Sequence, residues 1–180
     1  MNDKIVLGSG KLYVTEATFE NGVANIPEDT VLETEANLLG LIQGGASITY
    51  TPTFYTAKDD LGLVSKKYLT EEEAILKSGI MTWNSSTLEK LCSTAVVSSD
   101  SSTRTVKIGG IERFNGKNYV IRFVHIDNAQ GDIRLTIVGS NEAGFEIAFA
   151  KDKETVINAE FKAVPNDSTG TLIIYEEKIK

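Results

Sequence analysis

The stretch Ile157-Asn158-Ala159-Glu160-Phe161-Lys162-Ala163 places an apolar side chain at every second position. This alternation is typical of a β-strand with one buried and one wet face. Ala46–Tyr55 and Ile133–Ile137 repeat the pattern, and Phe145, Ile147 and Phe149 continue it after Gly144. Turn residues separate the segments at 133–137, 145–149 and 157–163, so we expect these three to be antiparallel neighbours.

More strands are expected on both sides of this region. Arg104–Ile108 and Tyr119–Ile126 are rich in β-branched and aromatic residues and are joined through Asn115-Gly116. A turn at 166–170 leads into a last strand, Thr171–Glu176. We find no internal repeat and no proline-rich linker, so the sequence predicts one mainly antiparallel β domain over residues 1–180.

One helix is expected over about residues 85–95. Leu88, Leu91, Cys92 and Ala95 recur at helical spacing. Ser86 and Glu89 match a capping box, in which each side chain satisfies a free amide at the helix start. This places Cys92 on the packed face as a small buried hydrophobe. The serine-rich stretch 98–103 is expected to be a loop.

A long connection spans Thr56–Leu69, between the 46–55 strand and an extended segment over Glu72–Trp83. Connections of this length between strands are uncommon unless they are functional or disordered. This one carries both charge signs and several apolar residues, which favours a protruding loop that docks on a partner. A solvated hairpin tip is the alternative.

The chain is acidic, with a net charge of -7 and an isoelectric point of about 4.8. Binding to nucleic acid by phosphate neutralisation needs lysine and arginine, and an acidic surface also opposes adsorption to anionic membranes. The charge therefore indicates either simple solubility or a surface that lets nucleic acid pass without sticking. A single cysteine, no signal-peptide pattern and no long apolar run predict a soluble protein that folds in a reducing cytosol.

No catalytic constellation is visible. His125, the one histidine, lies in an apolar strand with no nucleophile nearby in sequence, so we expect it to be a satisfied strand residue. No metal-ligand, phosphate-loop or nucleophile-elbow motif occurs. The segment 127–132 faintly matches a calcium loop but lacks its ligand spacing, and a plain turn is favoured. We expect no cofactor, no metal and no enzymatic activity.

Several segments of the chain resemble a known family. Residues 7–14, Gly44–Tyr50, the extended 72–83 segment, and the closing stretches 159–165 and 170–174 are similar to those of the major tail (tail-tube) proteins of tailed bacteriophages. The resemblance covers nearly the whole chain and lies in the order of the segments and in their general residue pattern. It implies an antiparallel β-sandwich or barrel with one flanking α-helix and a long inter-strand stacking loop.

The resemblance also implies a function. Members of this family form hexameric rings whose strands join into one inner barrel, and the rings stack into a tube through which DNA passes. The partners implied are further copies of the chain, a tape-measure protein and a tail-terminator protein. The implied location is the virion tail, assembled in the cytoplasm of the bacterial host.

The resemblance assigns roles to particular residues. Thr56–Leu69 corresponds to the stacking loop, with Lys58, Asp59, Asp60, Leu61, Leu63, Lys66, Lys67 and Tyr68 as contact residues. The candidates for the lumen are Ser47, Thr49, Thr51, Thr53, Glu71, Glu73, Lys77, Asn158, Glu160 and Lys162. Lys77 and Lys162 suit a wall that repels phosphate only if they pair with nearby acids. The alternative for all of these positions is ordinary outer surface.

Other function classes stay open. One is a non-catalytic β-sandwich adhesion or carbohydrate-binding module, for which Trp83, Tyr50, Phe54 and Tyr55 are the aromatic candidates. Another is the tube subunit of a phage-tail-like bacteriocin or secretion system, which would share the fold. Assembly into rings or tubes would distinguish both tube readings from the binding module.

Overall fold

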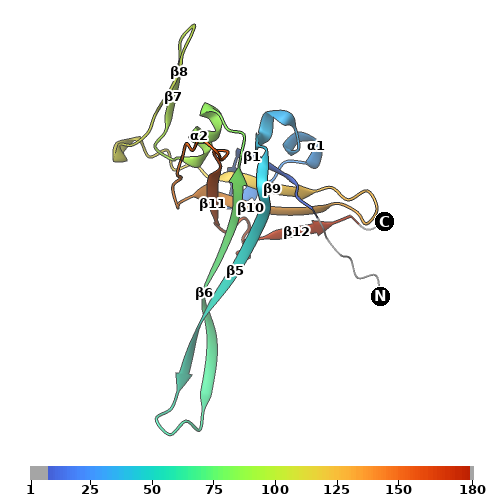
Figure 1. Cartoon of the computed structure of the whole chain (residues 1–180). Helices are drawn as coiled ribbons and strands as arrows, with labels where there is room; N and C mark the ends of the chain where they lie inside the picture. Colours follow the sequence, from blue (N-terminus) through green and yellow to red (C-terminus); the bar gives the residue numbers. More distant parts are fainter. Residues whose placement is uncertain (1–7, 179–180) are drawn as a thin grey trace.

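The computed structural model describes residues 8–178 and is built around an antiparallel sheet. Within that range the sheet has eight strands, in the order β4-β1-β9-β10-β11-β6-β5, with β12 also paired to β10 (Figure 1). The strands are β1 Lys11–Glu16, β4 Leu38–Gly40, β5 Ile42–Lys58, β6 Ser65–Ile80, β9 Tyr119–His125, β10 Ile133–Asn141, β11 Ile157–Ala163 and β12 Ile174–Glu177. The predicted mainly β, antiparallel fold class is confirmed.

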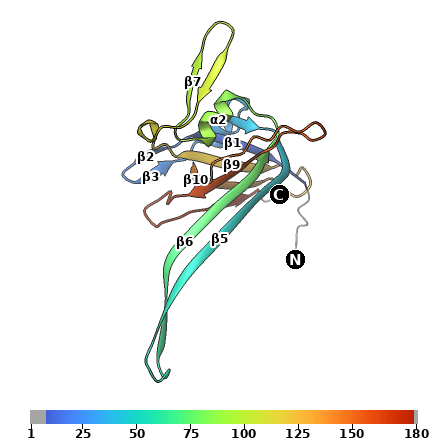
Figure 2. The same cartoon turned by 60° about the vertical axis from the view of Figure 1, so that its left-hand side comes forward.

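The sheet divides at β10. Residues 133–136 pair with β12, whereas residues 139–141 pair with β11. Gly139 lies at the change of partner, where a β-carbon would approach the Lys162 carbonyl oxygen to 1.9 Å. A glycine is therefore required for the two backbones to come this close. β11 pairs in turn with β6, and β6 with β5. These two long strands extend away from the body of the sheet (Figures 1 and 2).

Apolar side chains form a core on each face of the sheet. The larger core includes Leu76, Ile121, Ile137 and Phe161 and is covered by α2 (Ser85–Leu91) through Leu88 and Leu91. The smaller core joins Tyr13, Val120, Val124 and Val138 to Leu32 of α1 (Asp29–Leu32). Side chains of β9 alternate between the two cores, which explains why every residue of that strand is buried.

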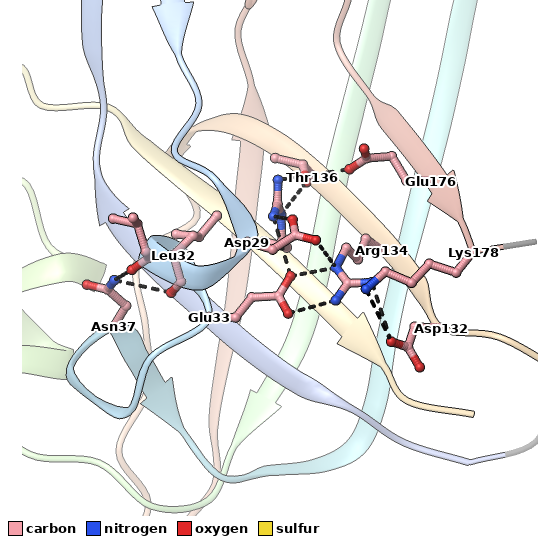
Figure 3. A network of polar contacts seen from close by, with 11 residues as sticks. Asp29, Leu32, Glu33, Asn37, Asp132, Arg134, Thr136, Glu176 and Lys178 are labelled. Atoms are coloured by element: carbon pink, nitrogen blue, oxygen red, sulfur yellow. Dashed lines mark hydrogen bonds and ion pairs between the residues drawn. The ribbon is translucent and has the colours of Figure 1, made fainter. Parts of the chain in front are cut away.

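A buried ion network fastens α1 to the sheet (Figure 3). The Arg134 guanidinium donates to both carboxylate oxygens of Glu33, at 2.6 and 2.9 Å. Arg122 donates to Asp29 at 2.6 Å and to the Thr136 hydroxyl at 2.9 Å. The hydrogen bond to Glu33 is the main reason that the pKa of Arg134 lies above its ordinary value. Both arginine side chains are less than a tenth exposed, so these carboxylates compensate cations that are almost out of water.

Two hairpins lie outside the main sheet, and a short helical turn follows α1. β2 (Thr18–Glu20) pairs with β3 (Val23–Asn25), and β7 (Val96–Ser99) pairs with β8 (Arg104–Lys107). The β7–β8 hairpin projects from the end of the molecule opposite to the β5–β6 hairpin in both views (Figures 1 and 2). The 3₁₀ turns are η1 Glu35–Asn37 and η2 Ile111–Arg113.

Some predicted elements differ from those observed. Residues 145–149 do not form a strand, although Phe145 and Ile147 still pack against the larger core. The serine-rich segment 98–103 is not a loop throughout, because Ser98 and Ser99 belong to β7. Arg104–Lys107 and Tyr119–His125 lie in different sheets. The last strand begins at Ile174 and not at Thr171.

The predicted helix is shorter and is capped one step earlier. It ends at Leu91, and Cys92 is the extended residue that terminates it. The capping box is made by Asn84 and Thr87, not by Ser86 and Glu89. Asn84 accepts hydrogen bonds from the amides of Ser86 and Thr87, and the Thr87 hydroxyl accepts one from the Asn84 amide. Asparagine is as good an N-cap as serine, so spacing could not decide between the two sites.

Candidate assembly surface

The β5–β6 hairpin is the most prominent feature of the molecule. Its pairing runs from Ile42 opposite Ile80 to Lys58 opposite Ser65. β11 pairs with β6 only over residues 75–80. Beyond that point the hairpin is a two-stranded ribbon whose long edges have no pairing partner in the described part of the chain. Unpaired edges of this length are a template for pairing with other chains.

The predicted loop Thr56–Leu69 is wrong in its bounds. β5 extends to Lys58 and β6 begins at Ser65, so only residues 59–64 form the connection. The Asp59 carboxylate accepts hydrogen bonds from the amides of Leu61 and Val64, and Gly62 adopts a positive φ of 68°. Lysines and polar residues in a strand weaken the alternation signal, which explains the error.

The tip of the hairpin combines exposed apolar and basic side chains. Leu61, Leu63 and Val64 are between 69% and 80% exposed. Behind them, the Lys67 ammonium lies 3.9 Å from the centre of the Phe54 ring, and the Lys66 ammonium lies 4.9 Å from that of Tyr68. The predicted contact residues therefore gather at one end of the molecule, where their cation–aromatic contacts and their strand pairing are all with residues of the same hairpin.

The candidate lumen residues lie on one face of three neighbouring strands. Directly opposed residues in a sheet share a face. Ser47 is opposite Lys77, which is opposite Glu160, and Thr49 is opposite Ile75, which is opposite Lys162. Further out, Thr51 and Thr53 are opposite Glu73 and Glu71. Asn158 lies one pair further in, opposite Gly79. We call this set, with the half-buried Ile75 that sequence reasoning missed, the polar face.

Both lysines of the polar face are paired with acids. Lys77 lies 2.9 Å from Glu160, and Lys162 lies 3.0 Å from Glu73. The hydrogen bond to Glu73, helped by the charges of Glu73 and Glu142, raises the pKa of Lys162. Glu73 and Glu160 balance the two lysines, so Glu71 leaves the polar face with a net negative charge. Lys77 and Lys162 thus have the acidic partners that the sequence analysis required of them.

The opposite face of the hairpin is apolar. It begins with Ile48 and Leu76 against the larger core and continues outward to Tyr50, Phe54 and Leu69, each about half exposed. A bulge at Thr70 shifts the register between Thr53 and Phe54, and this keeps Leu69 beside Phe54. The Tyr50 hydroxyl donates to the Glu72 carboxylate, and this hydrogen bond is the main cause of the raised Tyr50 pKa. The apolar stripe thus extends past the part of the core that covers it.

The other residues singled out by sequence have structural roles. His125 is buried and its Nδ1 lies 2.8 Å from the Ser9 carbonyl oxygen, but its Nε2 has no hydrogen-bond partner, so the ring is only half satisfied. Cys92 is half-buried beside the Thr94 hydroxyl. The Asp127 carboxylate accepts hydrogen bonds from the amides of Ala129 and Gln130, which is a turn. Among residues 8–178 no group of three or more potential metal ligands occurs.

Comparisons with protein-family models and with curated proteins give no significant match. Within the described residues, no helix has the length and apolarity needed to cross a membrane.

Proposed function

We propose that this chain is the structural subunit of a phage tail tube, which assembles into stacked hexameric rings that form a conduit for DNA. The observation that carries the proposal is the polar face. Hydroxyl and carboxylate groups occupy one side of three adjacent strands, and the two lysines among them are ion-paired. A wall of this composition offers phosphate no free cation on which to anchor.

The free edges of the hairpin support assembly with copies of the same chain. An isolated two-stranded ribbon is marginally stable in water. Here its outer half carries unpaired backbone groups on both edges and an apolar stripe with Tyr50, Phe54 and Leu69. Joining such ribbons side by side into a closed barrel satisfies the edges and buries the stripe. The polar face then lines the interior, and the subunit is non-catalytic.

A second candidate is a carbohydrate-binding module. The Phe149 side chain is 81% exposed, and the centre of its ring lies 6.5 Å from the centre of the Trp83 ring. An exposed pair of aromatic rings favours this candidate, because such rings can stack on sugars. A carbohydrate-binding module would give no role to the long β5–β6 hairpin or to the ion-paired lysines of the polar face. The tail-tube proposal accounts for both.

Negative-stain electron microscopy of the purified chain at rising concentration tests the proposal. We expect rings and tubes for the wild type. A variant in which residues 59–64 are replaced by Asn-Gly keeps the strands in register through a two-residue turn and should form rings that do not stack. The matched control Phe149→Ser removes an exposed apolar side chain elsewhere and should still form tubes.

Two outcomes would contradict the proposal. A wild-type chain that stays monomeric at every concentration would argue against a self-assembling tube. Loss of assembly in Phe149→Ser, together with measurable binding of the wild type to a glycan array, would favour the carbohydrate-binding module.

A further inference from the structure

The two ends of β5 differ in charge and are far apart. The chain runs from α1 through η1 and β4 directly into β5, which is extended over 17 residues. At about 3.3 Å per residue, such a strand spans roughly 55 Å. The α1 end, in the upper body of the molecule in Figure 1, therefore lies far from the hairpin tip at the lower end.

The α1 end is acidic. No lysine or arginine occurs between Lys11 and Lys58 in the sequence. Of the acids on α1 and its flanks, Asp29 and Glu33 are taken up by the arginines beneath them. Glu28 and Glu35 are exposed, with the 60% exposed side chain of Val31 between them in sequence. One Glu35 carboxylate oxygen lies 3.3 Å from the Lys11 ammonium, but the Glu35 side chain is 79% exposed, so this surface pair offsets its charge only in part. We call Glu28, Val31 and Glu35 the α1 pole.

The hairpin tip has the complementary character. Lys58, Lys66 and Lys67 are exposed there beside Leu61, Leu63 and Val64. The Asp59 carboxylate is engaged by the amides of the turn, which leaves the lysines as the main outward charges together with Asp60. In a chain of net charge -7, a basic apolar tip is an exception to the overall charge.

We infer that the α1 pole is the surface that receives the hairpin tip of a second copy of this chain. Two different surfaces that lie far apart make a heterologous contact, which propagates into an open, head-to-tail assembly. Lys66 and Lys67 would face Glu28 and Glu35, and Leu61 and Leu63 would pack near Val31. This inference rests on the proposed tube and names the partner surface of its stacking element.

The competing acceptor is the β7–β8 pole. Ile111 and Phe114 are 93% and 66% exposed there, so apolar area alone would also allow a tip to dock. The neighbouring charges are Arg104, Lys107 and Arg113 with Glu89, Asp100 and Glu112, a balanced set that offers a basic tip no net attraction. Charge complementarity therefore selects the α1 pole.

A charge-swap experiment tests the inference. Lys66→Glu with Lys67→Glu, and separately Glu28→Lys with Glu35→Lys, should each raise the protein concentration needed for tube growth by about tenfold, because two exposed attractive pairs become repulsive. A chain with all four substitutions restores opposite charges and should grow tubes near the wild-type concentration. Lys151→Glu with Lys153→Glu is the control for the lysine swap, with the same change in net charge at another exposed site.

Cysteine cross-linking gives an independent readout. In a Cys92→Ser background, mixing a Leu63→Cys chain with a Val31→Cys chain under oxidising conditions should give a disulfide-linked dimer. A mixture of Leu63→Cys with Ile111→Cys should not. Preferential cross-linking to Ile111→Cys would overturn the inference. So would a wild type that forms tubes while the variant with all four charge substitutions does not. Either result would leave the proposed tube itself uncontradicted. A wild type that neither assembles nor cross-links would contradict both.

Discussion

At the scale of single residues, the sheet relies on charge pairs whose members are distant in sequence. Glu33, directly after α1, reaches Arg134, and Asp29 of α1 reaches Arg122. On the polar face, Glu73 reaches Lys162 in the same manner. The two kinds of pair differ in exposure. The arginines are nearly buried, whereas Lys162 and Glu73 are each close to half exposed, so the arginine pairs matter far more for stability.

Glu33→Gln should destabilise the monomer by about 3 kcal/mol, because it leaves the nearly buried Arg134 cation without its two-point partner. Urea unfolding measured by circular dichroism would give the free energy of unfolding. Adding Arg134→Met removes the stranded charge and should recover most of the loss. A Glu33→Gln variant within about 0.5 kcal/mol of wild type would show that Asp29 and Asp132 suffice to hold Arg134.

At the scale of elements, the β5–β6 hairpin divides into an inner part and an outer part. The inner part has β11 on one side and the larger core beneath it. The outer part has only its own two strands and the cation–aromatic contacts near the tip. Local stability follows burial and the number of pairing partners, so the two parts should open independently.

Hydrogen exchange should reveal this division. In the monomer we expect the amides of residues 50–57 to exchange at least about a hundredfold faster than those of β9 and β10, since few contacts oppose local opening. In assembled tubes the same amides should become protected, because neighbouring chains pair with the free edges. Mass spectrometry of peptides from both states measures the difference. Unchanged exchange on assembly would mean that the hairpin edges do not form the subunit contact.

At the scale of the whole molecule, the distribution of charge matters more than its sum. Acids dominate the outer polar face and the α1 pole, and basic groups collect at the hairpin tip. An assembly that places the polar face inside repels phosphate there, while the ends of the subunit attract each other. Because the end-to-end attraction is between exposed charges, it weakens as salt is raised.

The interior charge can be tested with DNA. Wild-type tubes should not retain a fluorescent DNA duplex at physiological salt. Tubes of Glu71→Lys with Glu73→Lys should retain it with an affinity that falls steeply as salt rises, because added cations and the released Lys162 bind phosphate. Fluorescence anisotropy after sedimentation of the tubes measures this. Equal retention by the control Glu89→Lys with Glu112→Lys, which changes exposed sites at the other pole, would contradict an interior position for Glu71 and Glu73.

The sequence by itself determined the fold class and the sidedness of the strands. Alternation in residues 46–55 and 157–163 depends only on the two-residue period of a strand, so it correctly placed Ser47, Thr49, Glu160 and Lys162 on the wet side. It also placed the helix to within a few residues, because an apolar stripe at helical spacing is a local property.

Only the tertiary structure decided which strands are neighbours and where the chain ends its strands. The pairing of Lys77 with Glu160 joins residues far apart in sequence, and a periodic pattern contains no information about partners. Residues 56–58 and 65–69 became strand because each had a cross-strand partner, despite side chains with weak β-propensity. Residues 145–149 alternate correctly but did not form a strand. A strand is held by hydrogen bonds to a segment that can be distant in sequence. The number and the length of the strands therefore depend on the tertiary structure.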